Sequence, residues 1–309
     1  RLWERIYASI ATEIRKRGLA ARLIFAGALR LGLRAARECQ QGRQPGLPLR
    51  LLLRFADALV FRKIRARFGG RMRICASGSA PLGRQLAEFY MAIGLPLVEG
   101  YGLTEGGVIV MNPPARPRPG SIGKVLPGVE VRVADDGELL FRSPTLFSGY
   151  YHDPEATAKV LQDGWLYTGD IGELDEEGYI YITGRKKELI VTSSGKKIYP
   201  AHIETLFKLE PVVSQVLLVG DRRPYMAALI TVNATAAQAL GCPVDGAVKK
   251  AVERVNRRLA PFEQIRRFRI LERDFSIERG ELTATMKLRR GRLLEQYRET
   301  ISELYAGRV

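Results

Sequence analysis

The residues best suited to chemistry lie in two short segments near the middle of the chain. In residues 164–170 an isolated acid, Asp170, follows a threonine and a glycine. Residues 184–200 carry Arg185 after a turn glycine, further basic residues, and Gly195 beside a pair of lysines. Arginine and lysine side chains bind anions, and glycine leaves the backbone accessible. The two segments therefore predict a polar site that faces an anion.

The sequence changes character on either side of these segments. Residues 120–183 contain short β-branched runs between Gly and Pro turns, whereas helical and strand patterns alternate after residue 200. With 309 residues the chain also exceeds a typical single domain. We therefore predict two domains that share one site: residues 1–184, a hinge at 185–188, and residues 189–309.

A second group of candidate residues lies upstream, at the ends of two predicted strands. A strand at 71–76 precedes the small residues Gly78, Ser79 and Ala80, which would let a flat ring or an acyl chain approach the backbone. A helix at 84–93 and a strand at 95–99 follow, and the second strand leads into a loop at 100–105. Loops at the carboxyl ends of the strands are where α/β sheets place ligands.

Together these segments carry a family resemblance. The chain resembles the adenylate-forming enzymes, a superfamily that includes the acyl-CoA synthetases, and within it the bacterial long-chain fatty acid CoA ligases. Five motifs in the family's order carry this resemblance along nearly the whole chain: Tyr101 to Glu105, Gly137 to Leu139 with Gly149 and Tyr150, Tyr167 to Asp170, Gly184 to Pro200, and Leu282 to Lys287.

The resemblance implies a role for each matched residue in the first domain. Tyr101 would stack on adenine, with Gly102 and the 78–80 turn completing the nucleotide site. Thr104 would contact phosphate, and Glu105 would hold Mg²⁺. Asp170 is placed in a turn between strands, where it would accept hydrogen bonds from both ribose hydroxyls.

The resemblance also implies roles for four residues farther along the chain. Arg185 would pair with ribose or phosphate, and Lys187 stands at the family's hinge position. Gly195 would let the pantetheine arm of coenzyme A pass. Lys287 would be the catalytic lysine that reaches the α-phosphate and the substrate carboxylate. Ala284 stands where the family usually has proline, although the spacing to Lys287 is intact.

The implied reaction joins a fatty acid to coenzyme A in two steps, with ATP and Mg²⁺. Neither step needs a nucleophile from the protein, which must instead neutralise anions in the transition state. The family's Gly-rich phosphate loop is not found in this sequence. We therefore expect a piece of a longer ligase, lacking about half of it, that has weak or no activity alone.

The fold expected from this pattern is mixed α/β and α+β. Residues 1–70 should be basic and helical, and residues 71–119 should form the strand-helix-strand nucleotide segment. Residues 120–184 should form a small barrel or a distorted sheet. Residues 189–309 should form a mobile α+β domain with a tail helix from about 289.

The charge is concentrated at one end of the sequence. Residues 1–75 hold 18 Lys and Arg against four Asp and Glu, which is most of the net charge of +16. Arginines interrupt the apolar run at 19–36, which argues against a signal peptide or a membrane-spanning helix. The isolated cysteines and histidines predict neither disulfides nor zinc sites. A cytoplasmic location is expected, with peripheral contact to the inner face of an anionic membrane as an alternative.

Other functions remain open at this level. A fatty acyl-AMP ligase is a near relative, although the insertion that would favour it is not seen. A non-catalytic protein that binds acyl-CoA or a membrane is the second alternative. The basic residues are interpreted first as the outer face of helices that pack against an upstream half. A nucleic-acid binder is disfavoured, because the basic segment has no interleaved aromatic residues and no recognisable motif.

Overall fold

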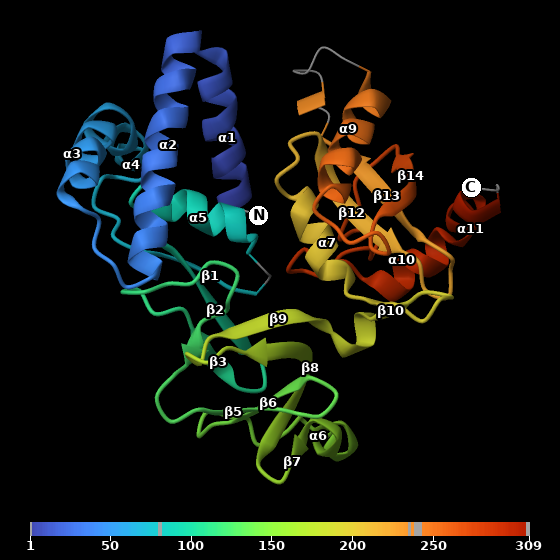
Figure 1. Ribbon diagram of the computed structural model, residues 1–309. Helices are drawn as coiled ribbons and strands as arrows, with labels where there is room; N and C mark the ends of the chain where they lie inside the picture. Colours follow the sequence, from blue (N-terminus) through green and yellow to red (C-terminus); the bar gives the residue numbers. More distant parts are fainter. Residues whose placement is uncertain (1, 80–81, 234–235, 238–242, 307–309) are drawn as a thin grey trace. The chain divides into compact units, whose positions relative to one another are not determined.

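The computed structural model describes residues 2–79, 82–233, 236–237 and 243–306 (Figure 1). The chain divides into two compact units, Arg1–Thr183 and Gly184–Val309. Among the described helices, none combines the length and the apolar character that crossing a bilayer requires.

The first unit begins with the predicted helical region. Its helices are α1 (Leu2–Lys16), α2 (Leu19–Gln40), α3 (Leu47–Ala56), the π-helical turn η1 (Asp57–Phe61) and α4 (Arg62–Ala66). Helix α2 packs closely on α5 (Arg84–Ala92). A Cβ atom on Gly32 would lie 2.3 Å from the Ala92 carbonyl oxygen, so the absence of a side chain at Gly32 permits this approach.

A four-stranded sheet follows, in the order β1 (Cys75–Ser77), β2 (Leu97–Leu103), β3 (Gly107–Met111) and β4 (Lys124–Val125). Strands β1 and β2 are parallel and are joined through α5, which confirms the predicted strand-helix-strand order. The first strand is shorter than predicted.

The predicted loop at residues 100–105 is wrong in its first part. Strand β2 continues to Leu103, because residues 100–103 stay paired with β3. Tyr101 and Gly102 therefore lie in a strand, and the turn begins at Thr104.

The β-rich part of the first unit is an open, distorted sheet rather than a barrel within the described residues. It comprises β5 (Glu130–Val133), β6 (Glu138–Arg142), β7 (Leu161–Gln162), β8 (Trp165–Leu174) and β9 (Ile180–Arg185). The order is β5-β6-β8-β7, with β9 also paired to β8. Helix α6 (Pro154–Val160) is capped by Asp153, whose Oδ1 accepts a hydrogen bond from the Ala156 backbone N–H at 2.9 Å. Residues of both sheets, including Ile109, Val110, Leu139, Phe141 and Ile180, form one apolar core.

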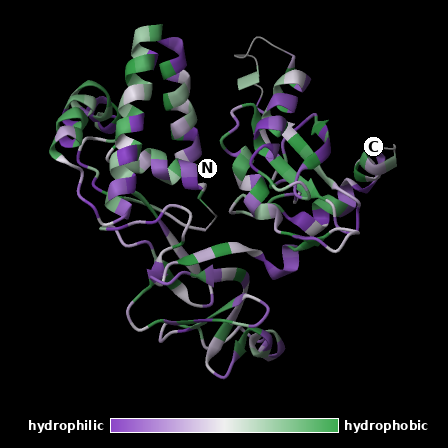
Figure 2. Cartoon of the chain, viewed as in Figure 1, coloured by the Kyte–Doolittle hydropathy of each residue, from purple (hydrophilic) through white to green (hydrophobic). Residues whose placement is uncertain are grey.

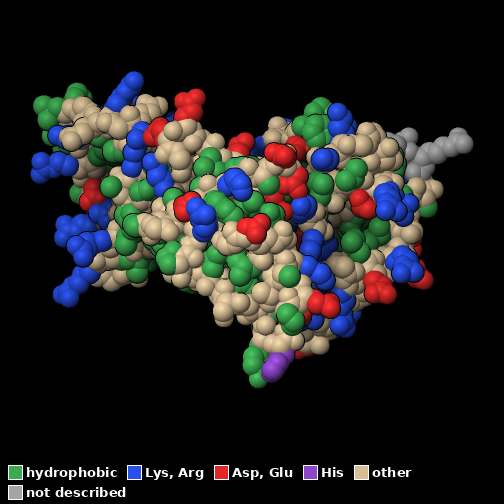
Figure 3. All heavy atoms as spheres, turned by 90° about the horizontal axis from the view of Figure 1, so that it is seen from below, with side chains coloured by type: hydrophobic (Ala, Val, Ile, Leu, Met, Phe, Trp, Pro, Cys, Tyr) green, Lys and Arg blue, Asp and Glu red, His purple; other side chains and the backbone are tan. Residues whose placement is uncertain are grey.

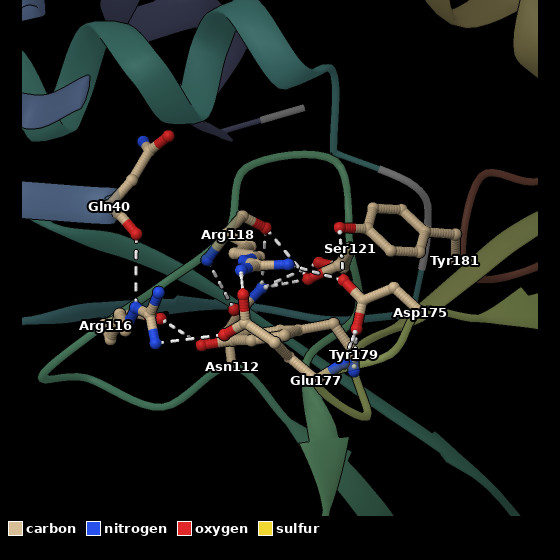
Figure 4. A network of polar contacts seen from close by, with 9 residues as sticks. All are labelled: Gln40, Asn112, Arg116, Arg118, Ser121, Asp175, Glu177, Tyr179 and Tyr181. Atoms are coloured by element: carbon tan, nitrogen blue, oxygen red, sulfur yellow. Dashed lines mark hydrogen bonds and ion pairs between the residues drawn. The ribbon is translucent and has the colours of Figure 1, made fainter. Parts of the chain in front are cut away.

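A network of polar contacts fastens residues 112–121 to the turn between β8 and β9 (Figure 4). The Arg118 guanidinium contacts Asp175 Oδ2 at 2.5 Å, also binds Glu177, and lies 4.4 Å from the centre of the Tyr179 ring. Burial alone would raise the pKa of Asp175, but hydrogen bonds from the Tyr179 and Glu177 backbone N–H groups and the Arg118 charge hold that pKa below its ordinary value. The charged carboxylate keeps this turn in place.

The second unit is the predicted α+β domain. It contains η2 (Lys186–Glu188), β10 (Ile190–Val191), β11 (Lys197–Ile198), α7 (Pro200–Phe207), β12 (Val213–Val219), β13 (Met226–Val232), α9 (Val244–Asn256), β14 (Ile265–Leu271), α10 (Arg290–Gln296) and α11 (Arg298–Ala306). Strand β13 is central in the sheet β12-β13-β14. One apolar core joins this sheet to α7 and α9, and a second joins it to α10 and α11. The strands are correspondingly hydrophobic (Figure 2).

Candidate active site

Two of the predicted nucleotide-binding residues meet in the first unit. The Tyr101 hydroxyl donates a hydrogen bond to Asp170 Oδ2 at 2.6 Å, although the two residues are 69 positions apart. Tyr101 also packs against the apolar core between the two sheets, with its ring 5.9 Å from that of Phe141. Asp170 is 3% exposed. The pair therefore forms a fixed polar contact between β2 and β8.

A bulge in β8 presents Asp170 to this contact. The register between β6 and β8 shifts, so that residues 168–170 lie opposite the single residue Leu139. Gly169 has φ +71°, and the Thr168 hydroxyl donates to the Leu139 carbonyl at 2.8 Å while it accepts from the Asp170 N–H at 3.0 Å. The predicted turn at Asp170 is thus an irregularity within one strand.

Glu138 braces the bulge from the neighbouring strand. Its Oε1 accepts a hydrogen bond from the Gly169 N–H at 2.7 Å, and its side chain is buried. Glu138 lies in one of the family motifs, but its sequence position alone predicted no role for it. Its position directly after a turn glycine was the signal available.

The small-residue turn lies beside the same strand. Ser77 pairs with Glu99, and a Cβ atom on Gly78 would lie 3.3 Å from the Gly100 carbonyl oxygen. Ser79 is exposed with φ +65°. Ala80 lies outside the described residues.

The turn at 104–106 places Thr104 and Glu105 at the end of β2. Thr104 is exposed and Glu105 is half-buried. The segment 143–150 clamps this turn. The Thr145 hydroxyl donates to the Gly106 carbonyl at 2.8 Å, and the Phe147 N–H donates to the Glu105 carbonyl at 2.7 Å.

Tyr150 completes the clamp through the Glu105 side chain. Its hydroxyl donates to Glu105 Oε1 at 2.5 Å, a charge-assisted hydrogen bond. This bond and partial burial raise the pKa of Tyr150 to about 12. Tyr150 belongs to one of the five family motifs, but its contact with Glu105, 45 positions away, could not be predicted from the sequence.

Glu105 is the predicted magnesium ligand. Among the described residues, no three His, Cys, Asp or Glu side chains gather into a metal-binding cluster. Mg²⁺ is often held by one or two carboxylates together with substrate phosphates and water. Glu105 suits such a partial site, because Tyr150 binds one carboxylate oxygen and Oε2 has no protein partner within the described chain.

Four predicted residues belong to the second unit. Arg185 ends β9 and Lys187 lies in η2, and both are exposed. Gly195 lies in the β10–β11 turn with φ +79°, and its N–H donates to the Thr192 carbonyl at 2.9 Å. A Cβ atom at Gly195 would meet no atom within 4 Å, so backbone conformation is what favours glycine there.

Lys287 lies at the end of a tight loop and is exposed. The Thr283 N–H donates to the Lys287 carbonyl at 2.8 Å, and the Thr283 hydroxyl accepts from the Lys287 N–H at 3.0 Å. Leu282 and Leu288 form a β-bridge at the base of the loop. Thr283 therefore closes the loop in which Ala284 replaces the family's usual proline.

Known proteins are similar to this chain over nearly its whole length. A model of the AMP-binding enzymes matches residues 32–151, and a model of the C-terminal domain of AMP-binding enzymes matches residues 187–309. The long-chain fatty acid CoA ligase FadD15 of Mycobacterium tuberculosis is 40% identical over 328 residues, which covers 99% of this chain and 53% of FadD15. The long-chain fatty acid CoA ligase ACSBG1 of Rattus norvegicus is 32% identical over 348 residues, covering 99% of this chain and 48% of ACSBG1.

A solved structure shows the same fold. The adenylation domain of the carboxylate reductase from Mycobacterium chelonae superposes with a TM-score of 0.70 and 25% identity, covering 91% of this chain and 45% of that chain. The fold is thus that of an adenylation domain. The chain belongs to the family of AMP-binding enzymes, and its homologues include long-chain fatty acid CoA ligases. It spans about half the length of the curated relatives it matches.

Proposed function

We propose that this chain is the carboxyl-terminal part of a long-chain fatty acid CoA ligase. The fatty acid carboxylate attacks the α-phosphorus of ATP, the bond to the β-phosphate oxygen breaks, and pyrophosphate leaves. The thiol of coenzyme A then attacks the acyl carbonyl carbon of the acyl-adenylate. The thiol proton is lost and AMP leaves.

The observation that carries this proposal is the hydrogen bond between Tyr101 and Asp170. The family resemblance assigns both residues to the adenosine part of ATP, and they come from separate motifs. Their contact at 2.6 Å on adjacent sheets supports a common nucleotide site. The 40% identity to FadD15 over 99% of the chain supports a long-chain fatty acid as the substrate.

The remaining site residues have electrostatic tasks in this proposal. Lys287 neutralises charge that develops on the α-phosphate and the carboxylate, and Thr104 contacts phosphate. Glu105 would hold Mg²⁺ through its free oxygen, and the bound ion would supply charge neutralisation on the phosphates. Tyr101 stacks on adenine and Asp170 binds the ribose hydroxyls. Because Asp170 is 3% exposed, ribose binding requires the groups covering it to shift.

Movement of the second unit belongs to the proposal as well. The boundary between the two units lies between Thr183 and Gly184, and Lys187 is three residues after Gly184. We place the hinge at Lys187, where rotation would withdraw Lys287 after adenylation and bring Gly195 to the acyl-adenylate. Coenzyme A would enter at Gly195.

The test is a chimera of this chain with the upstream part of FadD15, since the chain matches 53% of that relative. The chimera is supplied with oleate, MgATP and coenzyme A, and oleoyl-CoA is measured. Lys287→Ala should lower turnover at least 100-fold, as loss of a preorganised charge does in other enzymes. Arg289→Ala is the matched control, because Arg289 is also an exposed cation two residues away.

Two results would contradict the proposal. The first is a folded chimera without turnover, and the second is turnover that survives in Lys287→Ala. Oleoyl-adenylate that accumulates without oleoyl-CoA would instead favour a fatty acyl-AMP ligase. Supplying oleoyl-adenylate and coenzyme A to the chain alone tests separately whether it catalyses the thioester step.

A further inference from the structure

Helix α3 and the turn η1 after it expose a continuous row of large apolar side chains. Leu47, Leu51 and Phe55 follow one another at four-residue intervals, and Leu59 continues the row. Their exposed fractions are 70%, 48%, 68% and 57%. Side chains four residues apart lie on one face of a helix. We call this row the α3 stripe.

The α3 stripe faces away from the core of the first unit. The opposite face of the same segment buries Leu49, Ala56 and Phe61, and α3 packs on α2. The helix therefore already has its internal packing surface. Contiguous exposed apolar surface beyond that mostly marks a binding surface.

Cations border the stripe. Arg50 and Arg54 are exposed, each one residue before a member of the stripe, and Arg62 and Lys63 follow its last member. Three of the four acids in residues 1–75 are each paired with an arginine: Glu38 with Arg34, Asp57 with Arg65 and Glu13 with Arg67. In Figure 3, Lys and Arg side chains lie among hydrophobic ones at the left edge, the side on which α3 lies in Figure 1.

We propose that the α3 stripe and its bordering cations dock on an anionic lipid surface. An apolar row that enters the acyl boundary, flanked by arginine and lysine at headgroup level, is the pattern of an interfacial helix. The centre of a protein interface is usually depleted in charged residues. The excess of positive charge in residues 1–75 complements anionic headgroups.

The experiment measures sedimentation of this chain with vesicles of phosphatidylcholine alone or with 30% phosphatidylglycerol. The chain should bind the anionic vesicles, and binding should weaken as salt increases. Leu51→Ser with Phe55→Ser should lower the partition coefficient at least tenfold. Arg50→Gln with Arg54→Gln should lower it about tenfold on anionic vesicles and leave the weak binding to neutral vesicles unchanged.

Matched variants on the second unit serve as controls. Val244→Ser with Ile277→Ser removes two exposed apolar side chains, and Lys249→Gln with Lys250→Gln removes two exposed cations. Neither pair should change vesicle binding by more than twofold. All these side chains are exposed, and an unchanged far-UV circular dichroism spectrum would confirm that each variant remains folded.

Several outcomes would overturn the proposal. The chain could fail to bind anionic vesicles, or its binding could be independent of salt. The stripe variants and the control variants could also lose vesicle binding equally. If the chain instead binds the separately produced upstream part of FadD15, and the stripe variants abolish only that binding, the stripe is an interface within the ligase. A stripe-dependent dimer in sedimentation velocity, without vesicle binding, would make it a contact between two copies.

Discussion

Replacing Tyr101 with phenylalanine removes one oxygen from the contact that joins the two sheets. The Asp170 carboxylate is 3% exposed and accepts the Tyr101 hydroxyl at 2.6 Å. A hydrogen bond to a charged group contributes about 1.5–3 kcal/mol. We therefore expect Tyr101→Phe to lower the free energy of unfolding of the first unit by about 2 kcal/mol.

The chain offers a selective probe for this measurement. Its two tryptophans, Trp3 and Trp165, both belong to the first unit, and Trp165 lies in β8 with Asp170. Urea unfolding followed by tryptophan fluorescence therefore reports on the first unit even if the second unfolds separately. With a slope of about 2–3 kcal/mol/M, the midpoint should fall by roughly 0.7–1 M.

Tyr167→Phe is the matched control on the same strand. Tyr167 is half-buried, and its hydroxyl makes no hydrogen bond within the described chain. Tyr167→Phe should change the free energy of unfolding of the first unit by no more than about 0.5 kcal/mol. A double-mutant cycle with Asp170→Ala should give a coupling energy of about 2 kcal/mol. A coupling energy near zero would refute a stabilising bond between Tyr101 and Asp170. Equal losses of unfolding free energy in Tyr101→Phe and Tyr167→Phe would refute it as well.

Two further predictions concern the helices and the clamp on Glu105. Gly32→Ala would place its Cβ 2.3 Å from the Ala92 carbonyl oxygen, so it should destabilise the first unit by about 1–3 kcal/mol in the same fluorescence assay. In the same helix, a Cβ at Gly27 would meet nothing within 4 Å, so Gly27→Ala should stabilise the first unit by about 0.5–1 kcal/mol. A first unit that is more stable with Gly32→Ala than with Gly27→Ala would disprove the packing argument. The pKa of Tyr150 is raised to about 12, so its stabilising effect is complete below about pH 10 and is lost as pH rises through 12. NMR of ¹³Cζ-labelled tyrosine should find Tyr150 still protonated at pH 11, and Glu105→Gln should bring its pKa back toward 10, whereas an unchanged pKa would exclude the charge-assisted bond.

Much of this architecture could be predicted from local patterns. The helical first segment, the strand-helix-strand unit and the α+β domain follow from periodicity and turn residues. The errors came from pairing between distant segments. Tyr101 was predicted to lie in a loop, but pairing with β3 extends the strand.

The candidate site shows the same division between local and distant information. The family resemblance pointed to Tyr101, Glu105 and Asp170 as residues of one site. The supporting roles of Glu138 and Tyr150 depend on contacts across 31 and 45 positions. Such contacts are decided by sheet register and tertiary packing, which no single stretch of sequence contains.

The close approach at Gly102 also limits how this sequence can diverge. A Cβ atom there would lie 2.2 Å from the Gly107 carbonyl oxygen and 2.9 Å from the Val108 Cα, and both are backbone atoms that no rotamer change can move. Any descendant that keeps this hairpin must keep glycine at position 102, whereas the exposed Thr104 meets no such steric limit. Loss of the glycine in a distant homologue would thus signal a rebuilt hairpin.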